Sequence, residues 1–229
     1  MRADVEDSSE DLGGTSKAIV NRYLEATNLQ PPAHSMEVEI NASVPQLKEH
    51  GKLRALRKIS KVGVITYRVL GFQGDNTVKK EVIARYLQAD LQSQSNSSMT
   101  LSPANYKFKL KGQKQLNNSQ TVYVFTVAPL KKRPGLFKGE LWLDSGSFLP
   151  VLEKGRLVKN PSIFFRKVDF ERAFAIQNGV SVPAHMTSTI DTRIVGKVEL
   201  DINYTSVADV SDDDVDETDT ASAASPSSL

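Results

Sequence analysis

The stretch TVYVFTVAPLKKRPGLFKGELWLDSGSFLPVL, residues 121–152, constrains the fold of this chain more than any other part. Up to Pro129 its apolar side chains recur at every second position, which is typical of a strand with one buried face. A second apolar run spans Leu136–Leu143, and the turn sequence D-S-G-S separates it from a third run, Phe148–Leu152. Three adjacent runs with no helix between them predict an antiparallel meander.

Alternation of the same kind continues on both sides of this meander. Ser35–Val44 is apolar at every second position, and Glu37 and Glu39 lie on its other, solvated side. Asn178-Gly179 separates two apolar runs and predicts a hairpin, because a type I′ turn requires positive φ at both central positions. The other predicted strands, which bring the total to about ten, are Lys48–Lys61, Val62–Phe72, Tyr106–Lys111, Gly155–Lys159, Ser162–Ile176, Val182–Asp191 and Ile194–Tyr204.

Two helices are predicted in the first half of the chain. The first begins with Thr15 or Ser16 as its N-cap, carries apolar residues such as Ile19 and Tyr23 at helical spacing, and ends before Pro31. The second, Thr77–Leu91, is the clearest helix of the sequence. Its apolar stripe has a helical period and consists of Val78, Val82, Ile83, Tyr86, Leu87 and Leu91.

The order of these motifs resembles a known family. Y-V-F-x-V-x-P at Tyr123–Pro129, a basic loop, G-x-L-W-L-D at Gly139–Asp144, a turn and L-P-V at Leu149–Val151 are similar to the periplasmic LolA-like lipoprotein-carrier superfamily. That superfamily includes the outer-membrane lipoprotein-sorting protein and a sigma-factor regulatory protein of the envelope. The N-G hairpin, the following V-P and the long closing strands extend the resemblance over roughly residues 16–207.

The predicted fold is mainly β. It is a curved antiparallel sheet that forms an incomplete β-barrel of about ten to eleven strands, with an N-terminal helix and a second helix. The resemblance implies that the second helix covers the open side of the sheet, whereas the sequence pattern alone fits a helix on an ordinary β core equally well. We expect a single domain, residues 16–208, between disordered acidic tails at residues 1–15 and 209–229.

The charge of the predicted domain is strongly positive. The whole chain has a formal charge of +2, but residues 16–208 carry 28 Lys and Arg against 15 Asp and Glu, a net of +13. A well-solvated basic surface accounts for this excess, and so does attraction to an anionic partner such as phospholipid headgroups or nucleic acid.

Several kinds of chemistry find no support in the sequence. Cysteine is absent, which excludes a disulfide framework, a thiolate metal site and a cysteine nucleophile. His34, His50 and His185 are isolated and lack metal-ligand spacing, and no G-x-S-x-G motif is present. No apolar run reaches the length of about 18 residues expected of a membrane-spanning helix. We therefore assign no catalytic, cofactor-binding or metal-binding residue and predict a protein that is not an enzyme.

The resemblance implies a periplasmic carrier that binds lipid or lipoprotein acyl chains in an apolar half-barrel cavity, in outer-membrane lipoprotein or lipid sorting. A barrel of about ten strands is too wide to be filled by its own side chains, and each methylene removed from water is worth about 0.8 kcal/mol. We expect a monomer that contacts membrane surfaces or envelope proteins transiently. The candidates for lining the cavity are Val82, Tyr86, Leu87, Phe125, Phe137, Trp142, Phe148, Phe164 and Phe170.

In the sorting carrier, an arginine on an early strand holds the lid closed. Arg54, Arg57 and Arg68 are the candidates for that position here. The periplasmic location assumes that a signal peptide has been removed, because Met1-Arg2 leads directly into acidic sequence; the protein would be cytoplasmic if the chain were the complete gene product.

Two alternative functions remain open. The first is an envelope-stress sensor of the same fold, which would add a protein partner. The second is a cytoplasmic nucleic-acid-binding β protein, for which the positive charge and the placing of Tyr106 and Phe108 between lysines are the arguments. We expect no nucleic acid partner if the carrier hypothesis holds.

Overall fold

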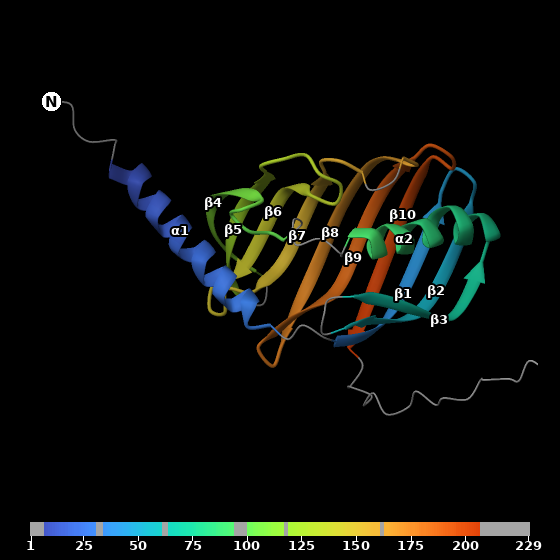
Figure 1. The fold of residues 1–229 in the computed structure, drawn as a ribbon, viewed down its shortest axis with the longest axis horizontal. Helices are drawn as coiled ribbons and strands as arrows, with labels where there is room; N and C mark the ends of the chain where they lie inside the picture. The colour runs from blue at the N-terminus through green and yellow to red at the C-terminus, as the bar shows by residue number, and fades with distance from the viewer. Residues whose placement is uncertain are drawn as a thin grey trace, which may run out of the picture.

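A single antiparallel sheet dominates the computed structural model, which describes residues 7–30, 34–60, 64–93, 100–116, 119–160 and 163–206 (Figure 1). Its ten strands lie in the order β3-β2-β1-β10-β9-β8-β7-β6-β5-β4. Because β3 and β4 are the two edges, the sheet is open, as predicted for an incomplete barrel. The strands are β1 His34–Val44, β2 Glu49–Ile59, β3 Ile65–Gly74, β4 Tyr106–Gln115, β5 Thr121–Pro129, β6 Phe137–Asp144, β7 Pro150–Leu157, β8 Phe165–Gln177, β9 Val180–Thr192 and β10 Lys197–Ser206.

The predicted meander and hairpin are confirmed. Strands β5, β6 and β7 are consecutive neighbours, and Asn178 and Gly179 join β8 to β9 with φ of 52° and 78°. The division of one strand was predicted wrongly, because the runs 148–152 and 155–159 both contribute to the single strand β7, Pro150–Leu157. The reason is that Glu153 and Lys154, between the two runs, continue the pairing with both β6 and β8.

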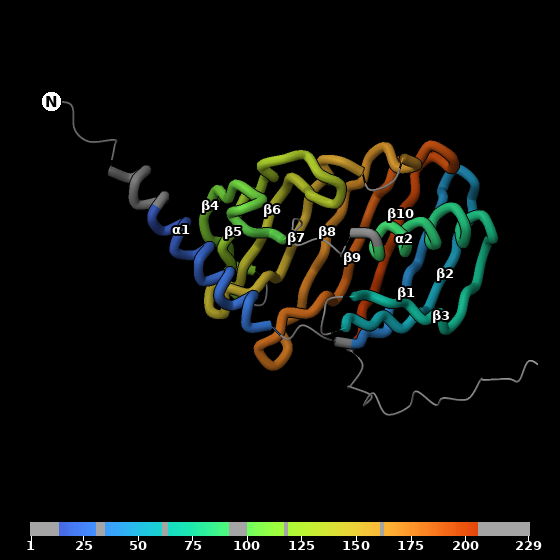
Figure 2. The backbone as a smooth tube through the Cα atoms, in the orientation of Figure 1, coloured from blue at the N-terminus to red at the C-terminus, as the bar shows by residue number. Residues whose placement is uncertain are grey.

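Two helical segments accompany the sheet in the described part of the chain: α1, Asp7–Asn28, and a continuous segment made of the π-helix η1, Val78–Ile83, and α2, Ala84–Ser93. The predicted N-terminal boundary is wrong, since α1 begins at Asp7 and residue 15 lies inside it. Gly13 and Gly14 disfavour a helix by only about 1 kcal/mol each, which is too little to end it. Figure 2 shows the C-terminal part of α1 beside the β4 end of the sheet, in agreement with contacts between α1 and β4. The predicted tail 209–229 lies outside the described residues.

The helices lie on one face of the sheet, which we call the inner face; Ile40, Phe125 and Ile202 point to it. Two hydrophobic clusters form there. The first joins Val78, Val82 and Ile83 of the η1 segment to β1, β2 and β8–β10, and the second joins Ile19, Val20 and Tyr23 of α1 to β4–β6. Phe170 and Leu157 pack against both clusters and therefore connect them across the middle of the sheet.

Two glycines bring the backbones of β6 and β7 close together between these clusters. Gly139 and Gly155 are direct partners in the register. A Cβ atom at Gly139 would overlap the backbone oxygen of Lys154 and lie 2.6 Å from the Cα of Gly155. Only glycine fits at this crossing, and no side chain rises from the inner face at either position.

Candidate functional site

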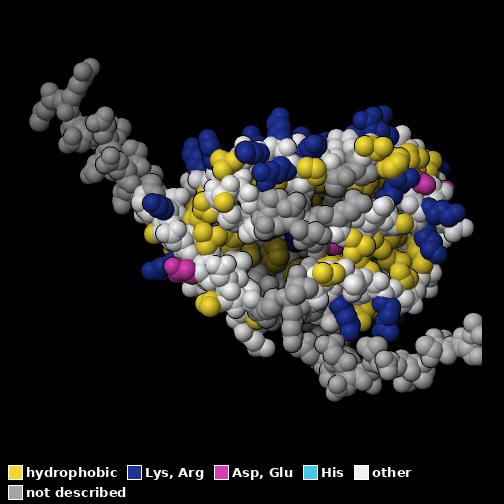
Figure 3. Space-filling view, in the orientation of Figure 1, with side chains coloured by type: hydrophobic (Ala, Val, Ile, Leu, Met, Phe, Trp, Pro, Cys, Tyr) yellow, Lys and Arg dark blue, Asp and Glu magenta, His cyan; other side chains and the backbone are white. Residues whose placement is uncertain are grey.

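The inner face is hollowed between its two clusters. Figure 3 views the molecule from this side and shows a depression in the middle of the face, with hydrophobic side chains inside it. Four apolar or aromatic residues that pack against the first cluster are only half-buried and keep part of their surface exposed: Tyr86, Leu87, Phe164 and Phe170. Phe170 packs against the second cluster as well. This depression is the candidate functional site.

The predicted cavity residues are divided between the core and this depression. Val82, Phe125 and Phe137 are 3%, 0% and 6% exposed, so they are close-packed core residues. Phe148 is half-buried against the second cluster, where it stacks on Tyr123 with ring centroids 6.0 Å apart. The exposed apolar surface of the site is therefore supplied by the other inner-face candidates, Tyr86, Leu87, Phe164 and Phe170.

Trp142 lies on the opposite face of the sheet, which we call the outer face. It is opposite Val124 in the register and packs with Val124 and Ile176 in a small third cluster, whereas its neighbours Leu141 and Leu143 face inward. Its Nε1 donates a hydrogen bond of 2.9 Å to Glu140. The prediction that Trp142 lines the inner cavity is wrong, because both sides of β6 carry apolar residues and the alternation alone does not reveal which side is inner.

We therefore expect the fluorescence of Trp142 to be insensitive to ligands bound at the inner face. Saturating wild-type protein with a long-chain fatty acid should leave the wavelength of maximum emission unchanged, because the sheet separates the indole from the ligand. In a Trp142→Phe, Tyr86→Trp variant, whose single indole lies at the depression, the same titration should shift the emission to shorter wavelength. A shift in the wild type alone would contradict this placement.

Arg57 is the arginine that contacts the covering helix. It points to the inner face of β2, and its Nε donates a hydrogen bond of 3.0 Å to the hydroxyl of Tyr67 on β3. The same hydroxyl donates a 2.7 Å bond to the carboxylate of Asp90 on α2, and Arg57 itself lies 3.6 Å from that carboxylate. The side chains of Arg57 and Asp90 are only 11% and 18% exposed. Burial, and next the charge of Asp90, raise the pKa of Tyr67, which keeps the phenol protonated as a donor.

The other two candidate arginines lie elsewhere. Arg54 is on the outer face, where its Nε donates a 2.8 Å hydrogen bond to Glu37 of β1. Arg68 on the edge strand β3 is exposed. The alternation of β2 separates Arg54 from Arg57, but only the pairing of Arg57 with Met36 reveals that Arg57 is the inward-facing one.

An ion pair on the inner face was not among the predicted site residues. Glu153 of β7 and Arg172 of β8 are register partners, with 3.6 Å between Oε2 and Nη1, and their side chains are 16% and 36% exposed. Burial raises the pKa of Glu153, and Arg172 opposes that shift. Burial also acts to lower the pKa of Arg172, but Glu153 and neighbouring acidic groups outweigh it, so the guanidinium stays charged. The sequence did contain a signal for this ion pair, because Arg172 follows the apolar, inward-facing residues Val168 and Phe170 of β8 at the two-residue spacing of one strand face.

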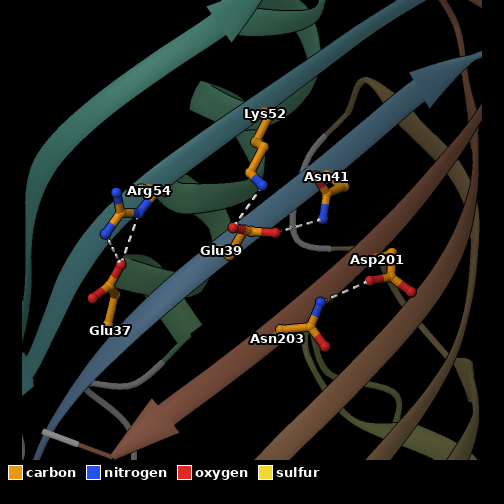
Figure 4. Close-up of polar contacts among 7 residues, drawn as sticks. All are labelled: Glu37, Glu39, Asn41, Lys52, Arg54, Asp201 and Asn203. Atoms are coloured by element: carbon orange, nitrogen blue, oxygen red, sulfur yellow. Dashed lines mark hydrogen bonds and ion pairs between the residues drawn. The ribbon is translucent and has the colours of Figure 1, made fainter.

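The outer face carries a separate groove of about 860 Å³ across β3, β2, β1, β10, β9 and β8. Figure 4 shows two ion pairs between β1 and β2 on this face, Glu37 with Arg54 and Glu39 with Lys52. Glu39 lies 2.7 Å from Lys52 and accepts a hydrogen bond from Asn41, and these bonds lower the pKa of Glu39. Asp201 lies 2.9 Å from His185. Among the described residues, no group of three or more His, Asp or Glu is placed to hold a metal ion.

Two further observations bear on the alternative functions. Tyr106 is 3% exposed and packs with Phe108 in the second cluster, so these rings face inward while the intervening lysines face outward. The alternating strand β4 therefore presents no aromatic platform on which bases could stack. Within the described ranges, no helix has the length and apolar character needed to cross a membrane.

Solved structures with a similar fold include members of the superfamily that the sequence resembles. A DUF1329 family protein from Desulfovibrio piger is 11% identical with a TM-score of 0.42, and the match covers 83% of this chain and 91% of that one. A LolA superfamily protein from Nitrosomonas europaea is 12% identical with a TM-score of 0.38, and the match covers 85% of this chain and 94% of that one. A putative outer membrane lipoprotein-sorting protein domain from Vibrio parahaemolyticus is 11% identical with a TM-score of 0.42, and the match covers 82% of this chain and 91% of that one.

In sequence, no protein-family model matches the chain, and neither does any curated protein. The structural similarities are too distant to carry a function across. The function must therefore be inferred from the residues of this chain.

Proposed function

We propose that the protein is a non-enzymatic periplasmic carrier that binds the acyl chains of a lipid or lipoprotein at the inner face of its open sheet. The observation that supports this most directly is the depression between the two clusters, where Tyr86, Leu87, Phe164 and Phe170 keep apolar surface exposed. An alkyl chain laid along this surface would leave water, at about 0.8 kcal/mol per methylene.

The helix over this face has the properties of a lid in its second half only. Val78, Val82 and Ile83 of η1 are at most 3% exposed and anchor the segment in the first cluster. Tyr86 and Leu87 of α2 are half-buried next to the depression. We infer that η1 stays in place while α2 moves to admit a ligand, and that Arg57 holds α2 down through Asp90 and Tyr67.

The surface charge fits delivery at a membrane. Between residues 16 and 208 the net charge is +13, and each basic residue near an anionic bilayer surface contributes about 1 kcal/mol of attraction. Such attraction would bring the carrier to its donor and acceptor membranes transiently, as a monomer.

The difference between anchor and lid is testable with two alanine substitutions on one helical segment. We expect Leu87→Ala to weaken the binding of a fluorescent long-chain fatty acid several-fold with little loss of stability, because Leu87 is only half-buried. Val82→Ala should do the reverse, since it removes methyl groups from the close-packed first cluster. Fluorescence titration and urea unfolding of the same samples measure both effects. If Leu87→Ala destabilises the protein and leaves binding unchanged, the helix is ordinary core.

The contact of Arg57 with α2 makes a separate prediction. Arg57→Gln should loosen α2, because it removes the ion pair between β2 and the mostly buried carboxylate of Asp90. Amide hydrogen exchange should become faster in α2 and stay unchanged in η1, whose buried residues hold it independently. Arg54→Gln, which breaks an ion pair on the outer face, is the matched control and should leave α2 unchanged.

Chain length is the general test of the proposal. Affinity for delipidated protein should rise steadily from short to long fatty acids, since each added methylene contributes its transfer free energy. Affinity that does not depend on chain length would contradict acyl-chain binding. Purification with a stable protein partner and no lipid would instead favour the sensor alternative.

A further inference from the structure

Arg172 lies on the apolar inner face with fewer partners than a guanidinium can use. Its Nη1 is 3.6 Å from the carboxylate of Glu153, which is within ion-pair range and beyond a good hydrogen bond. Within the described part of the chain, the hydrogen bond that Arg172 donates runs from Nη2 to the thioether sulfur of Met186, at 3.7 Å. A thioether is a weak acceptor, whereas a guanidinium presents a planar fork of several N–H donors. Within the described residues, no oxygen accepts a hydrogen bond from Arg172.

The surroundings of Arg172 are the candidate site itself. Its Cζ lies 5.9 Å from the ring centroid of Phe170, the residue that connects the two clusters. Tyr204 of β10 and Tyr86 and Asp90 of α2 lie close enough to raise the pKa of Arg172. Met186, its partner on β9, is 6% exposed. A permanent positive charge is thus held among apolar and aromatic side chains, and 36% of its side chain is still accessible.

An anion that reaches the accessible part of the Arg172 side chain can complete the coordination of its guanidinium. Glu153 supplies a negative charge, but its carboxylate lies 3.6 Å from Nη1, too far to accept a good hydrogen bond from the guanidinium. A carboxylate or phosphate of a ligand could accept two parallel hydrogen bonds from the guanidinium, which is the geometry that Arg binds best.

We infer that Arg172 binds the anionic head group of a single-chain amphiphile whose alkyl chain lies on the inner face. The inference rests on the proposed function and specifies its ligand class: a carboxylate, as in a fatty acid, or a phosphate, as in a lysophospholipid. Glu153 is the counter-ion of the ligand-free protein, and it competes with the ligand's anion for Arg172.

The experiment compares three ligands with the same tail: tetradecanoate, tetradecyl phosphate and tetradecanol. Each displaces the neutral dye Nile red from delipidated protein. We expect at least one of the two anions to bind about tenfold or more tightly than the alcohol, as expected for hydrogen bonds to a charged group. The anion that binds more tightly identifies the source of the head group. Arg172→Gln should abolish the preference over the alcohol and leave alcohol binding unchanged.

Three further variants separate the explanations. Arg54→Gln is the matched control, because it also removes a paired arginine but from the outer face, and it should keep the preference. Glu153→Gln removes the competing carboxylate and should raise the affinity for the anion. Arg172→Lys keeps the charge but loses the fork, so it should retain part of the preference even if Arg172→Gln fails to fold.

The outcomes distinguish this inference from the proposed function. Equal affinity of the wild type for anions and alcohol overturns the role of Arg172 and leaves acyl-chain binding standing. No binding of any of the three ligands overturns the proposed function as well. An anion preference that Arg172→Lys and Arg172→Gln both keep in full would place the anion elsewhere and overturn the inference.

Discussion

Replacing Gly139 with alanine should cost about 1–3 kcal/mol of folding free energy or more, although it adds a single methyl group. The new Cβ would overlap the backbone oxygen of Lys154 and lie 2.6 Å from the Cα of Gly155. Backbone atoms in the middle of a paired sheet cannot rotate away as the end of a side chain can. We therefore expect β6 and β7 to separate locally, which would disturb the junction of the two inner clusters.

The control for this prediction is Gly71→Ala on the edge strand β3. Nothing lies within 4 Å of a Cβ atom placed at Gly71. The free energy of unfolding of the Gly71→Ala variant should therefore stay within about 0.5 kcal/mol of the wild-type value. Urea unfolding of the two variants measures the difference. Equal midpoints for Gly139→Ala and Gly71→Ala would show that β6 and β7 do not approach so closely.

Phe125→Ala should be the most destabilising truncation among the predicted cavity residues, at about 3–5 kcal/mol. Its ring is 0% exposed in the second cluster and meets Phe108 edge-on, with 6.2 Å between centroids. A cavity of this size in close-packed surroundings cannot collapse fully. The matched variant is Phe148→Ala, which removes the same ring from a half-buried position and should cost clearly less. The reverse order in urea midpoints would mean that the second cluster is centred elsewhere.

Much of the fold could be predicted because the sequence patterns are local. The alternation in β1, the turns of the meander and the Asn178-Gly179 hairpin depend on neighbours in the chain, and each is found where it was expected. The two predictions that failed depend on weaker local signals. Polar residues 153 and 154 separate the two runs that were predicted as different strands, but the pairing of β7 continues through them. Thr15 or Ser16 was predicted as the N-cap of the first helix, but the helix already begins at Asp7.

The site was harder to predict because it depends on register. Trp142 and its leucine neighbours are all apolar, so only the pairing of Trp142 with Val124 places the indole on the outer face. Arg57 is assigned to the inner face by its partner Met36, which is separated from it by a turn. Glu153 and Arg172 become neighbours only when β7 pairs with β8. The apolar periodicity of a sequence describes one strand at a time, whereas the inner or outer position of these residues follows from how two strands pair.

The strand order has a consequence for how the chain acquires its structure. The first strand, β1, pairs with the last, β10, so that Val38 lies opposite Tyr204 in the middle of the sheet. This pairing closes a very long loop, which makes folding slow compared with the formation of the local hairpins. During synthesis, the β1–β3 hairpins must wait with one edge of β1 unpaired until Lys197–Ser206 has been made. Loss of β10 would accordingly separate the molecule into two incomplete sheets, one under η1 and the other under α1.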